Sequence, residues 1–210
     1  KPSSSIPRVT VKEPARTAEA RHAVTAPNVP LPAIAMTFHT PPEADADSFP
    51  LVVAQAILGG GESSRLYQSL VYSKQLAQEA SAYTDLREDI SLFGLFVILA
   101  SGKKLEDAEA AVYDEIKRLQ DQPVTDAELE KAKNQLVTAQ LLALETANGK
   151  ADVLGRAAVI RGDPNRINTD IMKLQAVTAA DVQRVMKKYF EATNRVVITY
   201  TAEAEGGATK

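Results

Sequence analysis

Residues 58–67 read Leu-Gly-Gly-Gly-Glu-Ser-Ser-Arg-Leu-Tyr and separate two apolar runs with helical spacing. The first run, residues 49–58, follows three acidic residues, which favour the positive end of a helix dipole. The three glycines predict that this helix ends in a turn that needs a positive φ. We expect Ser63 or Ser64 to cap a second helix over about residues 64–74.

Strands are predicted on both sides of this junction. Residues 33–40 alternate weakly in polarity and stop at two prolines, so they indicate a strand. Residues 77–87 and 91–101 indicate a hairpin that turns near Glu88-Asp89. The second strand of the hairpin is apolar at nearly every position, so it should be an interior strand covered on both faces, at least in part. Residues 195–201 indicate a last strand.

Helices are predicted over most of the chain between the hairpin and the last strand. An apolar stripe with helical spacing is formed by Leu105, Ala108, Val112, Ile116 and Leu119. Pro123 breaks this helix, and a capping box at 125–128 opens the next one. The inner face of that helix should carry Leu129, Ala132 and Leu136.

Two more helix starts follow after further helical turns up to about residue 160. Asp163-Pro164 should open a helix whose inner face carries Ile167, Ile171 and Leu174. Residues 178–181 should open another whose inner face carries Val182, Val185 and Tyr189. The order of elements predicts an α+β fold with two layers, a mainly antiparallel sheet covered on one face by helices.

The organisation along the chain suggests one folded domain with extended flanks. Residues 1–30 are rich in proline and predict an extended lead-in or linker, with one short edge strand at Arg8–Lys12. Residues 31–203 should form a single domain, and residues 204–210 a polar tail. The chain begins at Lys1 without a methionine or a signal-like apolar segment, so we expect a piece excised or processed from a longer protein.

The composition argues against several classes of function. The chain has 210 residues, a net charge of −3 and no cysteine. An acidic chain lacks the basic field that binds nucleic acid, and without cysteine it has neither disulfides nor thiolate metal sites. No apolar run approaches the ~20 residues of a membrane-spanning helix.

A metal site and a nucleophile are both poorly supported. The two histidines, His22 and His39, are 17 positions apart and belong to no His-Glu-x-x-His pattern, so a surface or capping role is expected for each. Ser63 and Ser64 lack the Gly-x-Ser-x-Gly elbow of serine hydrolases. Paired carboxylates such as Asp114-Glu115, and Glu128 with Glu130, are expected on solvated helix faces that carry ion pairs.

An anion site at the glycine junction is an alternative. Glycines before a helix can offer backbone N–H groups to a phosphate. However, Gly59–Gly61 follow a helical run rather than a strand, and Glu62 would repel an anion. A turn between two helices is therefore the preferred interpretation, and an anion-binding module at residues 59–64 is the weaker one.

The order of these motifs resembles the second-half domain of insulinase/pitrilysin-type zinc metallopeptidases. The resemblance covers residues 29–201 and rests on the junction at 58–67, followed by Leu76-Ala77. Two later helices are also similar to the family, at residues 128–135 and 178–189. The resemblance implies a helix layer on a mainly antiparallel sheet, and two related halves that enclose a chamber, with zinc held by the first half.

The resemblance also implies that the second half carries an arginine and, seven residues later, a tyrosine that contact substrate. Such groups can hydrogen-bond a peptide carbonyl and stabilise an oxyanion. Here these positions are occupied by Val71 and Gln78, and valine has no group that could do so. Arg65 and Tyr72 are also seven apart, but Arg65 corresponds to an ordinary arginine of the family.

We therefore expect the catalytically inert half of a zinc metallopeptidase, with zinc in an upstream half and no cofactor or metal in this chain. Candidate residues of the substrate chamber are Gly59, Gly60, Gly61, Ser64 and Gln78. Expected partners are the upstream half, a second subunit that supplies the arginine and tyrosine, and a peptide substrate. The alternative is a non-enzymatic scaffold or assembly subunit. By family analogy, a periplasmic location is favoured over a cytoplasmic one.

Overall fold

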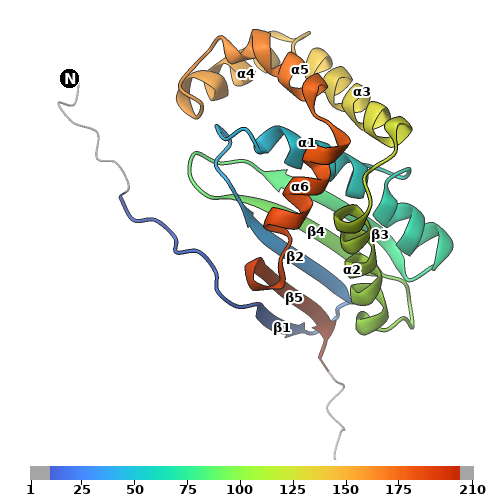
Figure 1. The fold of residues 1–210 in the computed structure, drawn as a ribbon. Coiled ribbons are helices and arrows are strands. Elements are labelled where there is room, and N and C mark those ends of the chain that lie inside the picture. The colour runs from blue at the N-terminus through green and yellow to red at the C-terminus, as the bar shows by residue number, and fades with distance from the viewer. Residues whose placement is uncertain (1–9, 204–210) are drawn as a thin grey trace, which may run out of the picture.

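The structure is a computed structural model that describes residues 10–203, and its centre is a five-stranded sheet (Figure 1). The order of strands across the sheet is β1-β5-β2-β4-β3. Only β1 and β5 are parallel, and the other neighbours are antiparallel. The strands are β1 (Ala20–Ala26), β2 (Ala33–Thr40), β3 (Ala77–Asp85), β4 (Ser91–Leu99) and β5 (Arg195–Ala202). The predicted mainly antiparallel sheet and its β3–β4 hairpin are confirmed.

Helices cover one face of the sheet. α1 (Ser48–Gly59), α2 (Leu105–Asp121) and α6 (Ala179–Tyr189) pack directly on the strands. Beyond them lie α3 (Asp126–Ala143), α4 (Ala147–Val159) and α5 (Arg166–Ala176), which contact α1 and one another at the top of Figure 1. Short helical turns are η1 (Tyr67–Ser73) and η2 (Ala192–Asn194). The two-layer α+β architecture is thus confirmed, with a helical extension at one end.

The two faces of the sheet differ in burial because side chains alternate along a strand. On the helix side, alternate residues of β4 are fully buried, namely Phe93, Leu95, Val97 and Leu99. On the open face, their neighbours Leu92, Phe96 and Ile98 are half-buried. The open face continues over β5 and β1 with Ile198, Tyr200 and Val24, which are about 36–44% exposed. An apolar surface therefore lies on the side without helices.

Local sequence signals predicted most helix starts. The apolar stripe of α2 is buried as expected, apart from a half-buried Leu105. The predicted capping box is present at Thr125 with Glu128, and the helix start predicted at 178–181 is a second box, formed by Thr178 with Asp181. In each box the threonine hydroxyl accepts the N–H of the acidic residue, whose carboxylate accepts the threonine N–H. These contacts depend on residues only three positions apart, which is why the sequence reveals them.

The lead-in contributes a strand that the sequence did not predict. Within residues 1–30, β1 pairs in parallel with β5, so this part is no linker. Five of its seven residues are exposed, because β1 lies at the edge of the sheet. Its sequence therefore lacks the alternation of apolar and polar residues by which strands are recognised. The predicted edge strand at Arg8–Lys12 is absent over its described part, residues 10–12. Its first two residues and the predicted tail at 204–210 lie outside the described residues.

The interior of α5 also differs from the prediction. Leu174 is buried, but Ile167 and Ile171 are only half-buried. Arg166 and Asp170 are buried instead, with the Arg166 Nε atom 3.1 Å from Asp170 Oδ1. Two buried side chains of opposite charge can satisfy each other's hydrogen-bonding groups. Such a pair can therefore occupy helix positions at which the helical spacing predicts apolar side chains.

Candidate functional site

The glycine junction has a mixed structural role. Of the three glycines in the junction, only Gly61 has a positive φ, +88°. The sequence predicted a positive φ in this turn but did not indicate which glycine would adopt it. Gly59 is buried at the end of α1, where a Cβ atom would lie 2.1 Å from the backbone nitrogen of Ala82 in β3. At Gly60 a Cβ atom would lie 2.5 Å from the carbonyl oxygen of Ala56. The first two glycines thus allow close packing, and the third makes the turn.

Neither serine caps the following helix, contrary to the prediction. Ser64 is buried, and its Oγ atom has no hydrogen-bond partner among the described residues. Ser63 Oγ instead accepts a hydrogen bond from Lys131 of α3. The N–H of Ser64 donates to Gly61 at 3.0 Å and that of Gly60 donates to Ala56 at 3.1 Å. Two amides of the suggested anion site are therefore already engaged.

The second predicted helix is largely a π-helix. Arg65 and Leu66 are α-helical, and η1 follows with the Lys74 N–H donating to Ser69 O at 2.9 Å. Just beyond η1, Gln75 has a φ of +50°, a conformation that non-glycine residues rarely adopt. Because π-helical turns are frequent at functional sites, this unusual backbone makes the segment between η1 and β3 a candidate functional region.

Val71 and Gln78 lie at the two ends of this irregular segment. Val71 is half-buried on η1 and packs against the core. Gln78 is exposed at a β-bulge, where the pairing of β3 with β4 skips from Ala77 to Glu79. Bulges re-aim side chains and are enriched beside active sites. The backbone presents Gln78 outward, while Val71 offers only apolar surface.

Arg65 and Tyr72 do not form a substrate-binding pair. Arg65 holds Glu128 through two hydrogen bonds, from Nε at 2.9 Å and from Nη2 at 3.0 Å. The bond from Arg65 outweighs desolvation and lowers the pKa of Glu128 to about 2, with help from Thr125. Tyr72 is 74% exposed. Arg65 therefore ties the junction to the start of α3, and Glu128 carries the expected ion pair on a side chain that is 36% exposed.

The other predicted carboxylate pair is split between solvent and interior. Asp114 is exposed, and its carboxylate is 3.5 Å from Lys74 Nζ. Glu115 is buried on α2, with one oxygen 3.4 Å from Arg118 Nη1. The expected solvated face is thus correct for Asp114 and wrong for Glu115.

The two histidines lie apart from any cluster of ligands. His22 is exposed on β1, and His39 is partly buried on β2, with its Nε2 atom 3.2 Å from Glu13 Oε1. Burial and the neighbouring Arg16 lower the pKa of His39. Within residues 10–203, no group of three or more histidine, aspartate or glutamate side chains could hold a metal ion. No helix in this part is long and apolar enough to cross a membrane.

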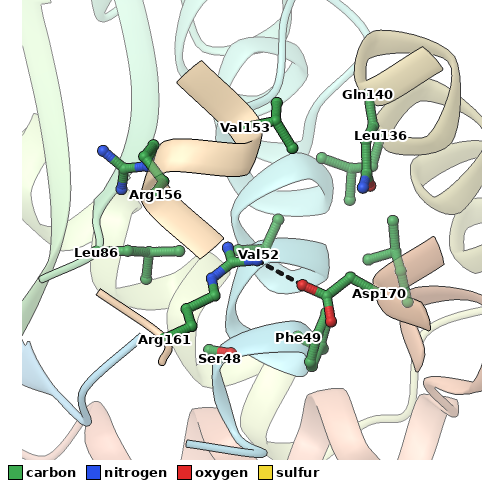
Figure 2. A pocket seen from close by; sticks show the side chains of 11 residues that line it. Ser48, Phe49, Val52, Leu86, Leu136, Gln140, Val153, Arg156, Arg161 and Asp170 are labelled. Atoms are coloured by element: carbon green, nitrogen blue, oxygen red, sulfur yellow. Dashed lines mark hydrogen bonds and ion pairs between the residues drawn. The ribbon is translucent and has the colours of Figure 1, made fainter. Parts of the chain in front are cut away.

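A cavity among the outer helices was not indicated by the sequence (Figure 2). It has a volume of about 240 Å³ and lies between α1, α3, α4 and α5. Arg161 and Asp170 form an ion pair at its wall. The residues that line it come from positions 48 to 174, so only the folded chain brings them together.

Comparisons with known proteins agree on one family. The model described as the peptidase M16 inactive domain matches residues 1–136. Mitochondrial-processing peptidase subunit beta of Lentinula edodes is 30% identical over 154 residues, which cover 68% of this chain and 32% of that protein. Cytochrome b-c1 complex subunit 2 of Rattus norvegicus is 28% identical over 154 residues, 70% of this chain and 33% of that protein. The chain thus spans about a third of these relatives.

A solved structure shows the same fold. A protease from Helicobacter pylori has a TM-score of 0.89 and 23% sequence identity to this chain. The similarity covers 95% of this chain and 48% of that protease.

Proposed function

Because this chain belongs to the family of peptidase M16 inactive domains, we propose that it forms the non-catalytic half of a zinc metallopeptidase and one wall of its substrate chamber. The observation that carries the proposal is the segment from Val71 to Gln78. Its π-helix and bulge are the kind of backbone found beside active sites, yet its two candidate positions lack charge. An oxyanion needs positive or N–H donors, and of the side chains at these two positions only that of Gln78 offers one.

The chemistry of hydrolysis would then belong to other parts of the protein. An upstream half supplies zinc ligands, and a second subunit supplies the arginine and tyrosine that Val71 and Gln78 replace. Gly59 holds the end of α1 against β3, and we expect Gly60, Gly61 and Ser64 to line the chamber only through backbone. Support for a larger protein comes from the relatives, of which this chain spans about a third. A periplasmic location remains the favoured proposal.

The proposal is tested on the full-length protein and on residues 1–210 alone. The full-length protein should bind one zinc ion and, together with the second subunit, cleave peptides, and residues 1–210 should do neither. Gln78→Ala in the full-length protein should change kcat/KM by no more than about twofold, since Gln78 contributes no transition-state charge. Calorimetry with zinc and a peptidase assay measure these quantities. Tight stoichiometric zinc binding by residues 1–210, or loss of activity in Gln78→Ala, would overturn the proposal.

A scaffold role is the second candidate. It is favoured by the similarity to cytochrome b-c1 complex subunit 2, whose name describes a component of an assembly. The two candidates differ in the upstream sequence. An inverted His-x-x-Glu-His motif and zinc in the full-length protein support the peptidase, and their absence supports the scaffold.

A further inference from the structure

We propose that the cavity between α1, α3, α4 and α5 binds a small carboxylic acid with an apolar chain. The inference is independent of the peptidase chemistry, because the cavity lies among the outer helices and its lining includes no residue of the segment from Val71 to Gln78. It rests on three features: apolar walls, an excess of positive charge and donors without a partner.

The walls of the cavity are mostly apolar. Figure 2 shows side chains from α1, α3 and α4 that face the same space. The apolar ones are Phe49, Val52, Leu86, Leu136, Val153 and Leu174. The volume of about 240 Å³ has room for about eight water-sized groups of ~30 Å³. This is below the ~300–1,000 Å³ of drug-sized sites, so the ligand should be a short chain.

Positive charge exceeds negative charge at one side of the cavity. Two carboxylates are present, Glu43 and Asp170, and their side chains are only 2% and 5% exposed. Arg161 bridges both of them. Arg166 and Lys173 add positive charge at Asp170, with nitrogen atoms at 3.1 Å and 3.6 Å.

Arg156 adds a further cation beside Glu43, 3.3 Å from Nη2 to Oε2. Nearby Asp85 is already paired with Arg87. Four cations therefore share two carboxylates, and this net positive charge favours an anionic ligand.

Two arginines have donors that a ligand could use. The Nε atom of Arg161 is buried and has no hydrogen-bond partner among the described residues. The side chain of Arg156 is 45% exposed, and its one hydrogen bond within that part of the chain is the long one to Glu43. Guanidinium groups bind carboxylates through charge-assisted hydrogen bonds. A carboxylate at the arginines, with its chain among the apolar side chains, would satisfy both parts of the cavity.

Alternative ligands fit less well. Inorganic phosphate would leave the apolar walls unused, and a cation would meet the surplus of arginine and lysine. A neutral apolar molecule would leave the buried Arg161 donor without a partner, which costs free energy.

The test uses octanoate with residues 1–210, followed by calorimetry and by thermal unfolding. One octanoate should bind per chain and raise the Tm, because a ligand that binds only the folded state stabilises it. Octanamide has the same shape without charge and should bind at least about tenfold more weakly. Equal affinity for octanoate and octanamide would overturn the proposal. So would a failure of octanoate to bind at about 10 mM, a concentration above the Kd of most specific complexes.

Two variants locate the site. Val153→Trp fills the cavity from α4 and should abolish octanoate binding. Val159→Trp, on the same helix but 79% exposed, should bind normally and serves as its control. Arg156→Gln should weaken binding about tenfold, whereas Lys150→Gln, an exposed position of α4, should not. Circular dichroism without ligand confirms folding of each variant, and unchanged binding by folded Val153→Trp contradicts the proposed location.

Discussion

Asp47 connects the start of α1 to α6 through three side-chain hydrogen bonds to its carboxylate. Arg184, Lys188 and Tyr189 donate to it at 2.7, 2.9 and 2.7 Å. Burial alone would raise the pKa of Asp47, but these three hydrogen bonds outweigh it and lower the pKa to about 2. The sequence suggested only that acidic residues precede α1, because the three partners lie more than 130 positions away.

Asp47→Asn should destabilise the chain by about 1–2 kcal/mol at pH 7, as expected for hydrogen bonds to a charged group with partly exposed partners. The folded-state pKa lies below the unfolded value of 3.8, so this contribution is present above about pH 4 and is lost as the pH falls towards 2. Urea unfolding at pH 7 and pH 3 should show the difference from wild type shrinking with acidity.

Asp114→Asn is the matched control, since Asp114 is 69% exposed and pairs only with Lys74 at 3.5 Å among the described residues. It should change the free energy of unfolding by less than about 0.5 kcal/mol at both pH values. A loss for Asp47→Asn that is the same at pH 7 and pH 3 would contradict the role assigned to its charge.

Among the elements, α4 is the least anchored helix. Ala157 is its only buried residue, while Leu154 and Val159 are 42% and 79% exposed. Sparse burial gives a helix a low free energy of local opening. The sequence predicted helical turns here, but it could not reveal how little of the helix is covered.

Gly155→Ala should stabilise α4. A Cβ atom at Gly155 meets nothing within 4 Å, and alanine is favoured over glycine in a helix by about 1 kcal/mol. Amide hydrogen exchange in α4 should slow by roughly fivefold, with little change in the strands. Gly59→Ala is the contrasting variant, because its Cβ atom would collide with β3 and lower the Tm. Faster exchange in α4 of Gly155→Ala would refute this account.

The elements that the sequence predicted share one property, which is that their signals are local. The capping boxes of α3 and α6 and the apolar stripe of α2 each lie within a few turns of helix. Strand β1 and the cavity depend on contacts between distant segments, so periodicity could not indicate them. The Arg166–Asp170 pair is local, but its burial depends on the segments that pack against α5. The positions of Val71 and Gln78 came from family resemblance, and their π-helix and bulge came from the structure alone.

At the scale of the whole molecule, the open face of the sheet is a surface that we expect the upstream half to cover. Ile198 and Tyr200 of β5 lie on it opposite Ala35 and Ala33 of β2, and the half-buried residues of β4 follow on the other side of β2. Contiguous exposed apolar surface in a soluble protein commonly marks an interface. Under the proposed function, the upstream half is the partner that covers this surface.

Ile198→Lys should therefore weaken co-purification of residues 1–210 with a separately expressed upstream half by at least about tenfold. The chain itself should stay folded, because Ile198 is already 36% exposed. Val11→Lys, at a position that is 83% exposed, is the control and should leave the complex intact. A complex of Ile198→Lys that survives size-exclusion chromatography like the wild type would place the interface elsewhere.

The parallel pairing of β1 with β5 has a mechanical consequence. Ala20 lies beside Val196 at one end of the pair, and Ala26 lies beside Ala202 at the other. The chain enters β1 at the first end and leaves β5 at the opposite one. A force that pulls the two flanks apart therefore shears all seven residue pairs together instead of peeling them off singly. The parallel pair at the edge of the sheet should therefore resist a pulling force applied to the two ends of the domain.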